Sequence, residues 1–276
     1  MPSSLPVVLL TGASRGLGLA TATLLLRGTS RLPRAHVVAI SRSKPDELAA
    51  LEKEYSGSSD DSPALLVVQG DVTDAKTNQK AVDGAVEKWG RLDALILNAG
   101  VVKFARLADA DPASFAEQLN INLVSLVTTL HAAAPHLRES PSGTGKVVLV
   151  SSGAAVGQYA GWGPYCAGKA GMNALARVLA VEEPKLAVWA VRPGVVATDM
   201  QADIRANGAE SMGEQHSKFI KLHADNQLLA PEDPGHVLAA LAVRGTRDEP
   251  KDKEGKGAGS IGAFLDWSEL SDYRRP

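Results

Sequence analysis

Seven short apolar runs alternate with longer helical segments along this chain of 276 residues. The runs occupy residues 7–10, 36–40, 64–69, 94–97, 146–150, 186–191 and 261–265. A continuous apolar run of this length is typical of a strand that is buried on both faces. Strands that alternate with helices indicate a parallel sheet with helices on both sides. The sequence therefore predicts an α/β fold with about seven parallel strands.

The segments between these runs have helical patterns, and no break divides the chain into two separate α/β units. The predicted helices span residues 17–26, 46–55, 76–88, 114–137, 165–182 and 234–242. Residues 245–260 are rich in glycine and in charges of both signs, from Arg247 to Lys256, which predicts a solvated surface loop. We therefore expect one domain over residues 1–276.

Composition excludes several classes of protein. The 29 Lys and Arg residues nearly balance the 31 Asp and Glu residues, so a basic nucleic-acid binder is not expected. No apolar run approaches the ~20 residues that a membrane span needs. The one cysteine, Cys166, excludes an internal disulfide framework, and the six histidines lack metal-ligand spacing. We expect a cytoplasmic protein without a metal, a nucleic-acid partner or a membrane partner.

A glycine-rich turn, Thr11-Gly-Ala-Ser-Arg-Gly-Leu-Gly18, joins the first predicted strand to the first predicted helix. Glycines at this position let backbone N–H groups approach a pyrophosphate at the helix N-terminus. Because strand, turn and helix occur in the required order, the motif favours a dinucleotide site. A tight turn with only a structural role is the alternative.

The end of the second predicted strand bears on the choice of dinucleotide. Folds that prefer NAD usually carry Asp or Glu there, to bind the ribose 2′-hydroxyl. Here Ser41 and Arg42 stand at that place, and the next acid is Asp46. Arg15 in the glycine turn supplies a second guanidinium. Two guanidinium groups suit a 2′-phosphate, so we predict NADP(H), unless both side chains are merely solvated.

Tyr165 and Lys169 stand four residues apart in a predicted helix and would therefore share one face. A free tyrosine has a pKa of about 10, and a fixed cation nearby can lower that pKa by about one to three units. Ser152 follows a predicted strand 13 positions before Tyr165, at the strand end where open α/β sheets bind ligands. Its hydroxyl could hold a carbonyl oxygen beside the tyrosine, although Ser151 is a rival for that role.

Taken together, these motifs resemble the short-chain dehydrogenase/reductase family over about residues 5–270. The resemblance rests, in order and spacing, on Thr11–Gly18, Asp71-Val72, Asn98-Ala-Gly100, Asn122, Ser152, Tyr165-x-x-x-Lys169 and Pro193-Gly194. Within the family the chain looks most similar to the branch of sepiapterin and benzil reductases, because of residues 41–43, 198–205 and 226–229. The resemblance implies a Rossmann-like doubly wound parallel sheet, NADP(H) and reduction of a carbonyl.

The resemblance also implies roles for individual residues. Tyr165 would protonate the developing alkoxide, and Ser152 would polarise the carbonyl. Lys169 would bind the nicotinamide ribose and lower the pKa of Tyr165. Asn122 would hold a helix backbone and a water that relays protons to Lys169, with Asn120 as the rival in register.

The expected cofactor contacts include residues that flank the adenine, support the sheet and meet the nicotinamide. They are Gly12, Ser14, Arg15, Gly16, Leu17, Gly18, Ser41, Arg42, Asp71, Val72, Asn98, Ala99, Gly100, Tyr165, Lys169, Pro193, Gly194, Val196 and Thr198. Residues 198–230 would close over the substrate. Trp162 and Met200 would then contact it together with Ser152 and Tyr165. Asp266 either anchors the substrate or is a surface acid.

The function that the resemblance implies is NADPH-dependent reduction of a ketone or diketone by hydride transfer. The expected partner is a small-molecule carbonyl compound, and the expected assembly is a homodimer or homotetramer. Two alternatives stay open. One is an alcohol dehydrogenase that acts on a steroid, polyol or secondary metabolite. The other is a redox sensor that binds NADP(H) without turnover.

Overall fold

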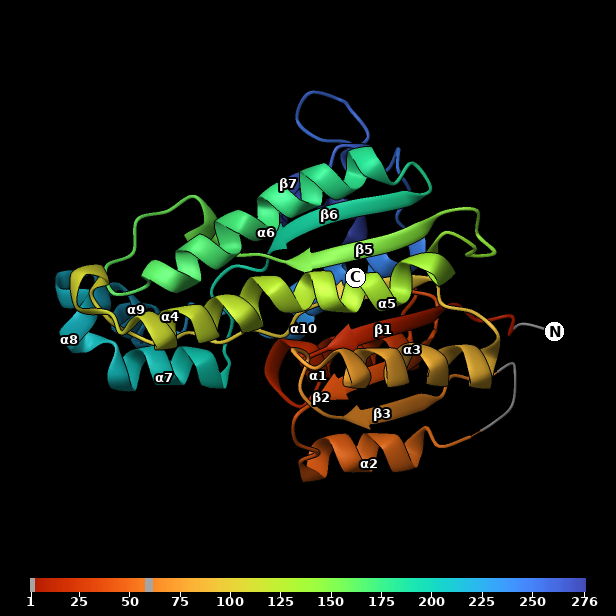
Figure 1. Cartoon of the computed structure of the whole chain (residues 1–276), viewed down its shortest axis with the longest axis horizontal. Helices are drawn as coiled ribbons and strands as arrows, with labels where there is room; N and C mark the ends of the chain where they lie inside the picture. The colour runs from red at the N-terminus through yellow and green to blue at the C-terminus, as the bar shows by residue number, and fades with distance from the viewer. Residues whose placement is uncertain (1–2, 58–61) are drawn as a thin grey trace.

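A computed structural model describes residues 3–57 and 62–276 of the chain. Over these residues, seven parallel strands form one sheet in the order β3-β2-β1-β4-β5-β6-β7 (Figure 1). The strands are β1 (Val7–Thr11), β2 (His36–Ser41), β3 (Leu65–Gln69), β4 (Ala94–Leu97), β5 (Gly145–Val150), β6 (Leu186–Arg192) and β7 (Phe264–Asp266). The order reverses between β1 and β4, as in doubly wound α/β sheets. The predicted fold class is confirmed.

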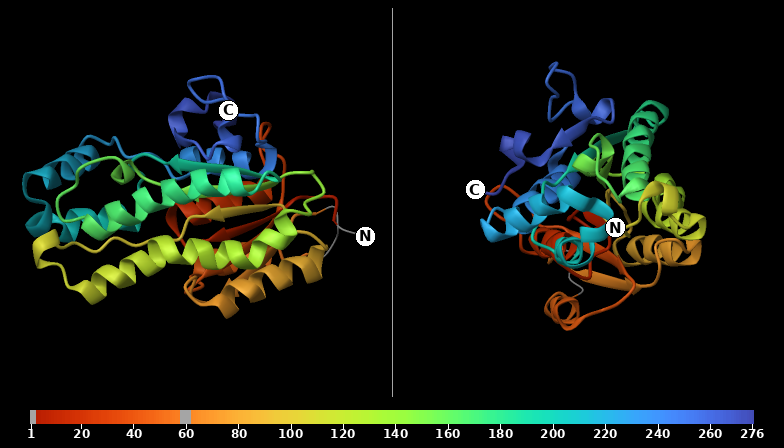
Figure 2. Two further views of the ribbon diagram at one scale, coloured as in Figure 1. Left: turned by 45° about the horizontal axis from the view of Figure 1, so that its top comes forward. Right: turned by 90° about the vertical axis from the view of Figure 1, so that its left-hand side faces the viewer.

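Helices cover both faces of this sheet (Figure 2). One apolar cluster joins the sheet to α1 (Gly16–Arg27), α2 (Asp46–Glu54) and α10 (Glu232–Arg244). A second cluster joins the other face to α3 (Ala75–Trp89), α5 (Ser125–Leu137) and α6 (Gly163–Glu182). β1, β2 and β5 are buried at every position, which explains why their sequences are continuous apolar runs. Burial of each large aliphatic side chain contributes about 1.5–3 kcal/mol.

The predicted helix over residues 114–137 is not one regular helix. It consists of α4 (Pro112–Leu119), a π-helical turn (Asn120–Val124) and α5. Asp111 begins α4 by accepting hydrogen bonds from the backbone N–H groups of Ala113 and Ser114. Apolar periodicity continues through the π-helical turn, so the sequence pattern does not reveal it. Single π-turns of this kind are frequent at functional sites.

Most of residues 198–230 are helical, although the sequence predicts no helix there. They form α7 (Asp199–Asn207), α8 (Ala209–Met212) and α9 (His216–Ala224) beyond the carboxyl ends of the strands (Figure 1). Gly208 and Gly213 divide the segment into pieces too short for clear periodicity. Both ends of the segment meet, because Val196 pairs with Leu229 in an isolated parallel bridge.

The charged segment 245–260 differs from the solvated loop that its composition predicts. The Arg247 guanidinium is partly buried and donates hydrogen bonds to the backbone carbonyls of Ala180, Glu183, Leu186 and Ser260. Other charges in the run are exposed, as predicted, including Lys253, whose side chain is 82% exposed. The last strand is also shorter than predicted, because Gly262 makes a turn at φ +62° before Phe264.

Candidate active site

A cleft of about 1460 Å³ opens at the carboxyl edge of the sheet and runs along the glycine turn to the start of α6. Open α/β sheets bind ligands at this edge, where the strand order reverses. Of the predicted site residues, all but Asn122 line this cleft. They are Gly12, Ser14, Arg15, Gly16, Leu17, Gly18, Ser41, Arg42, Asp71, Val72, Asn98, Ala99, Gly100, Ser152, Trp162, Tyr165, Lys169, Pro193, Gly194, Val196, Thr198 and Met200.

The glycine turn is held in a shape that other residues could not adopt. Gly12 has φ +71°, and a Cβ atom there would lie 2.9 Å from the Cα atom of Ala99. Asn98 fixes the turn from the neighbouring strand end, since its Nδ2 atom donates to the carbonyls of Thr11 and Gly12 at 3.0 and 3.1 Å. The family resemblance implies that Asn98 stabilises the sheet beside the cofactor, and these contacts are compatible with that role.

The N-terminus of α1 faces the cleft without a side-chain cap, because Arg15 in the N-cap position makes no capping hydrogen bond. Backbone N–H groups and the positive end of the helix dipole are therefore available to an anion. This donor set and the length of the cleft fit a nicotinamide dinucleotide. Gly12, Gly16 and Gly18 would then contact its pyrophosphate.

At the β2 and β3 end of the cleft, polar side chains line the wall, and they range from the buried Ser41 to the exposed Arg42. Arg42 is exposed, and within the described part of the chain its guanidinium has no hydrogen bond or ion pair. The Ser41 hydroxyl donates to the carbonyl of Ser43 at 2.7 Å. The Asp71 carboxylate accepts from the backbone N–H and the hydroxyl of Thr73, both at 2.8 Å, which orients the loop after β3.

Tyr165 lies in the first turn of α6 and is 8% exposed. Burial raises the pKa of its phenol to about 12, while a hydrogen bond with the Ser152 hydroxyl acts in the opposite direction. The net shift is opposite to the expected lowering, because the loss of hydration outweighs the hydrogen bond that favours the phenolate. The phenol is therefore held protonated at neutral pH.

Lys169 is 3% exposed, and its Nζ atom donates to the Val150 carbonyl at 2.6 Å. Its Nζ atom lies 5.6 Å from the centroid of the Tyr165 ring, so helix α6 does bring the pair together. Burial lowers the pKa of Lys169 to about 8. The ammonium group therefore loses its proton far more easily than an exposed lysine.

Ser152 and Ser151 have different environments. The Ser152 hydroxyl accepts from the Ala154 backbone N–H at 3.1 Å and lies beside Tyr165. The Ser151 hydroxyl is 2% exposed and donates to the Asn173 side chain at 2.6 Å. Ser151 thus has a structural partner, which leaves Ser152 as the serine available to a ligand near the tyrosine.

Asn122 lies behind the cleft, in the π-helical turn. Its side chain is fully buried and bonds both backbone groups of Val101, accepting from the N–H and donating to the carbonyl, each at 2.8 Å. Asn120, the rival in register, is exposed. The backbone that Asn122 holds is the loop after β4, which lines the cleft.

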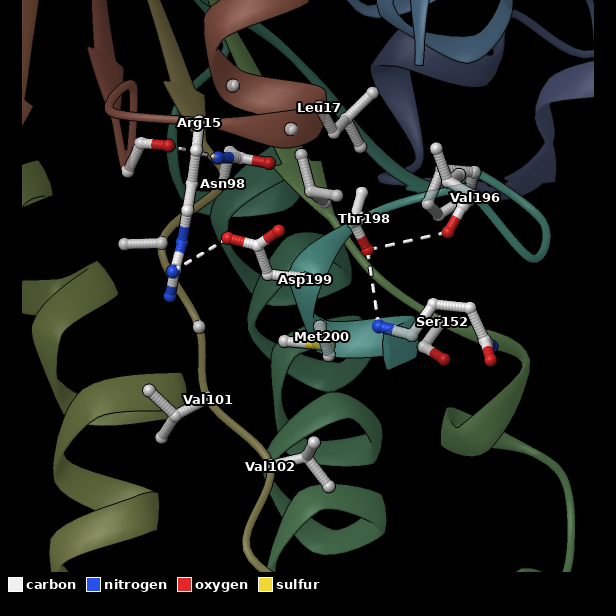
Figure 3. A pocket seen from close by; sticks show the side chains of 18 of the residues that line it. Arg15, Leu17, Asn98, Val101, Val102, Ser152, Val196, Thr198, Asp199 and Met200 are labelled. Carbon is white, nitrogen blue, oxygen red and sulfur yellow. Dashed lines mark hydrogen bonds and ion pairs between the residues drawn. The ribbon is translucent and has the colours of Figure 1, made fainter. Parts of the chain in front are cut away.

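The nicotinamide end of the predicted site lies in the loop after β6. Gly194 has φ +78° and packs under Leu229 and Trp267. Thr198 acts as the N-cap of α7, accepting from the Gln201 backbone N–H at 3.4 Å (Figure 3). Its predicted contact with a nicotinamide amide stays a prediction.

Aromatic side chains gather at the α6 end of the cleft. Trp162 stacks on Tyr159 and on Phe219 of α9, with centroid separations of 4.9 and 5.4 Å. Trp162 also meets the Tyr165 ring in a T-shaped contact, with 5.6 Å between the ring centroids. Met200 of α7 packs against the same cluster. The sequence predicts Trp162 and Met200 as substrate contacts, and this region supplies an apolar surface beside the phenol.

Asp266 also lines the cleft, and it is not a free surface acid. Its Oδ2 atom lies 2.6 Å from Arg192 Nε, and its Oδ1 atom accepts from the Ser268 backbone N–H and hydroxyl. Burial opposes its ionisation, but these hydrogen bonds and the Arg192 charge together hold its pKa below the usual range. A substrate would have to share this carboxylate with Arg192.

Sequence reasoning missed several residues that line the cleft, among them Val101, Val102 and Asp199. Val101 and Val102 directly follow the Asn98-Ala-Gly100 motif, so their position next to it in the chain could have revealed them. Asp199 lies on the opposite wall, and its Oδ2 atom is 2.8 Å from Nη1 of Arg15, a residue that the sequence does predict (Figure 3). These two residues are 184 positions apart, and no sequence signal connects them.

Two features are absent from the described residues, 3–57 and 62–276. None of their helices is both long and apolar enough to cross a membrane. No group of three or more His, Cys, Asp or Glu side chains among them is placed to hold a metal ion.

The fold and the cleft together define a doubly wound α/β protein with a site that fits a dinucleotide. A sequence profile described as short chain dehydrogenase matches residues 6–209. The chain therefore belongs to the short-chain dehydrogenase/reductase family, whose members bind NAD or NADP.

Relatives of known sequence and structure agree with this assignment. An uncharacterised oxidoreductase of Schizosaccharomyces pombe is 39% identical over 267 residues, which cover 96% of this chain and 97% of that protein. A benzil reductase of Bacillus cereus, described as forming (S)-benzoin, is 34% identical over 231 residues, covering 82% and 89%. The crystal structure of a Saccharomyces cerevisiae short-chain dehydrogenase/reductase, 32% identical, matches 98% of this chain and all of that chain, with a TM-score of 0.85.

Proposed function

We propose that this protein is an NADPH-dependent carbonyl reductase that converts a ketone or a 1,2-diketone to the alcohol. The arrangement of Ser152, Tyr165 and Lys169 carries this proposal. A protonated phenol, a serine hydroxyl and a buried ammonium meet beside an apolar aromatic surface, at the end of a cleft that fits a dinucleotide. This combination suits proton donation to the oxygen of a bulky carbonyl compound.

Each side chain has a defined part in the reaction. The Ser152 hydroxyl donates a hydrogen bond to the carbonyl oxygen of the substrate. The reduced nicotinamide, when bound, supplies the hydride that the carbonyl carbon receives. Tyr165 gives its proton to the oxygen as negative charge develops there, and its raised pKa keeps that proton in place until then. Lys169 holds the ribose and keeps positive charge near the phenolate that results.

Arg42 and the other residues at the end of β2 favour binding of NADPH over binding of NADH. No carboxylate occupies the residues directly after β2, where an acid would bind a ribose 2′-hydroxyl and repel a 2′-phosphate. The exposed Arg42 guanidinium is available for a charge-assisted hydrogen bond to that phosphate. A preference for NADH in steady-state kinetics would contradict this part of the proposal.

Aryl ketones and diketones are the substrates that the aromatic surface favours. Trp162, Tyr159 and Phe219 stack on one another close to Tyr165, and they give this end of the cleft an apolar aromatic wall against which an aryl group can pack. The benzil reductase of Bacillus cereus, at 34% identity, supports the same class.

The decisive experiment follows NADPH oxidation against a panel of carbonyl compounds. The panel contains benzil, an aromatic 1,2-dione, sepiapterin, a 3-ketosteroid and a simple aldehyde, each repeated with NADH. We expect turnover of the diketones with NADPH. Tyr165→Phe should lose at least 100-fold in kcat yet bind NADPH as tightly as the wild type.

The alternatives predict different outcomes. A redox sensor would show no turnover with any member of the panel, despite tight NADPH binding. A dehydrogenase working in the oxidising direction would turn over steroid or polyol alcohols with NADP and leave the diketones unreacted. Either result would replace the reductase proposal.

Location and assembly belong to the same proposal. We place the protein in the cytoplasm, where its single cysteine stays reduced and needs no disulfide partner. Its partner is a small-molecule carbonyl compound. We propose a homodimer or homotetramer, to be measured by size-exclusion chromatography with light scattering; a monomer at micromolar concentration would contradict it.

A further inference from the structure

An ion pair bridges the two walls of the cleft at its middle. Arg15 extends from the glycine turn, and Asp199 stands in the first turn of α7 on the opposite wall (Figure 3). The Arg15 Nη1 and Asp199 Oδ2 atoms are 2.8 Å apart, and the two side chains are 67% and 66% exposed. The walls approach each other here, since a Cβ atom on Gly16 would lie 3.0 Å from Thr198 Cγ2.

Arg15 is also the cation closest in sequence to the uncapped N-terminus of α1. That N-terminus is the part of the cleft where a phosphate is favoured by backbone N–H groups and the helix dipole. A phosphate bound there would compete with the Asp199 carboxylate for the same guanidinium. Arginine binds both groups by charge-assisted hydrogen bonds, but it cannot satisfy both fully at one time.

We propose that Asp199 is a competing anion that Arg15 exchanges for a phosphate of the incoming dinucleotide. The proposal rests on the proposed function only in taking the ligand to be a nicotinamide dinucleotide. Asp199 acts through Arg15 and is a positioning residue. It holds Arg15 across the cleft when no phosphate is bound, and it weakens phosphate binding by its own attraction for the guanidinium.

The exposure of the pair sets the size of the effect. Exposed ion pairs stabilise folded proteins only weakly, so the exchange is easily reversed. Removing the Asp199 charge should therefore tighten phosphate binding by about two- to five-fold, not by orders of magnitude. The same change should slow release of the dinucleotide by a similar factor, because affinity changes of this kind act mostly on dissociation.

Calorimetric titration of the full-length protein, without any carbonyl substrate, tests the exchange. The probes are adenosine 2′,5′-diphosphate, which carries the 2′-phosphate, and adenosine 5′-diphosphate, which does not. We expect Asp199→Asn to bind at least one of them two- to five-fold more tightly than the wild type. A gain confined to the 2′-phosphate probe places the exchange at the ribose, whereas an equal gain for both places it at the 5′-diphosphate.

Asp203 provides the matched control, because it lines the same cleft one turn further along α7 and bonds Asn207 instead of an arginine. Asp203→Asn should leave both affinities within two-fold of the wild type. In an Arg15→Ala background, Asp199→Asn should have no effect on either probe.

Two results would overturn the inference. One is an unchanged or weaker affinity in Asp199→Asn. The other is a gain that persists without Arg15, since Asp199 would then act by direct repulsion. Because no reaction is measured, a failed carbonyl panel with the expected titrations would refute the proposed reductase and leave this inference standing.

Discussion

Lys169 shows how the proposed function opposes stability at a single residue. Its ammonium group is buried, and the pKa of about 8 in the folded protein lies below the value of about 10.4 for an unfolded chain. The unfolded chain therefore binds more protons between these two pH values. The folded protein is penalised most below pH 8, and the penalty decreases as the pH rises toward 10.

A Lys169→Met variant should reveal this penalty. We compare the free energy of unfolding of the variant with that of the wild type at each pH. We expect the difference, variant minus wild type, to be about 1 kcal/mol larger at pH 7 than at pH 9. The reason is that only the wild type regains stability over this interval. Urea unfolding at the two pH values measures the difference, and a difference of zero or of opposite sign would show that Lys169 is not desolvated. The variant should also lose carbonyl reduction.

At this scale the sequence predicts which residues meet, but not what their surroundings do to them. The four-residue spacing brings Tyr165 and Lys169 to one face of α6, as predicted. The direction of the Tyr165 pKa shift is wrong in the sequence analysis because burial depends on Trp162 and on the helices that cover it. Those contacts are tertiary, and spacing alone does not contain them.

Elements with a continuous apolar run or an apolar face were predictable, and those held by single polar contacts were not. The seven strands appear in sequence as apolar runs because both faces are covered. The helices α7 to α9 lack such a pattern, since each is short and only a few of their residues, such as Ile204, Met212 and Phe219, reach the apolar cluster. The π-helical turn at Asn122 is likewise set by its hydrogen bonds to Val101.

Arg247 is the clearest case of a polar contact that organises an element. Its guanidinium bonds carbonyls at the C-terminal end of α6 and beyond, where a helix leaves carbonyls without backbone partners. Arg247→Ala should lower the free energy of unfolding by about 2 kcal/mol, because these carbonyls would lose a charged donor. Chemical denaturation measures the loss.

Lys253 in the same charged segment is the control for this prediction. Its side chain is exposed and pairs only with Glu269. Lys253→Ala should change the free energy of unfolding by less than about 0.5 kcal/mol. Equal effects of the two substitutions would mean that Arg247 is one solvated charge among others, as the composition alone suggests.

For the whole molecule, we expect cooperative unfolding. The cleft takes its lining from both ends of the sequence, and the strand order brings β1 beside β4 in the middle of one sheet. Neither half of the chain can therefore keep its packing when the other half unfolds. Trp89, Trp162, Trp189 and Trp267 report on all three apolar clusters.

Tryptophan fluorescence and far-ultraviolet circular dichroism should therefore give coincident urea transitions. Single-tryptophan variants provide the sharper form of this measurement, because each reports on one cluster. Transitions that separate by more than the error of the midpoints would contradict the single domain predicted over residues 1–276.

The meeting of Val196 with Leu229 has a consequence for how such proteins diversify. Leu229 donates its backbone N–H to Val195, and Ala197 donates to Leu229, both at 2.9 Å, so the segment between them leaves the sheet and returns to the same point. Its length and sequence can vary without moving any strand. Exchanging residues 200–228 for the corresponding piece of a relative should therefore transfer substrate preference while Thr198 and Asp199 stay in place at the cleft. This makes the segment the first place to recombine in directed evolution.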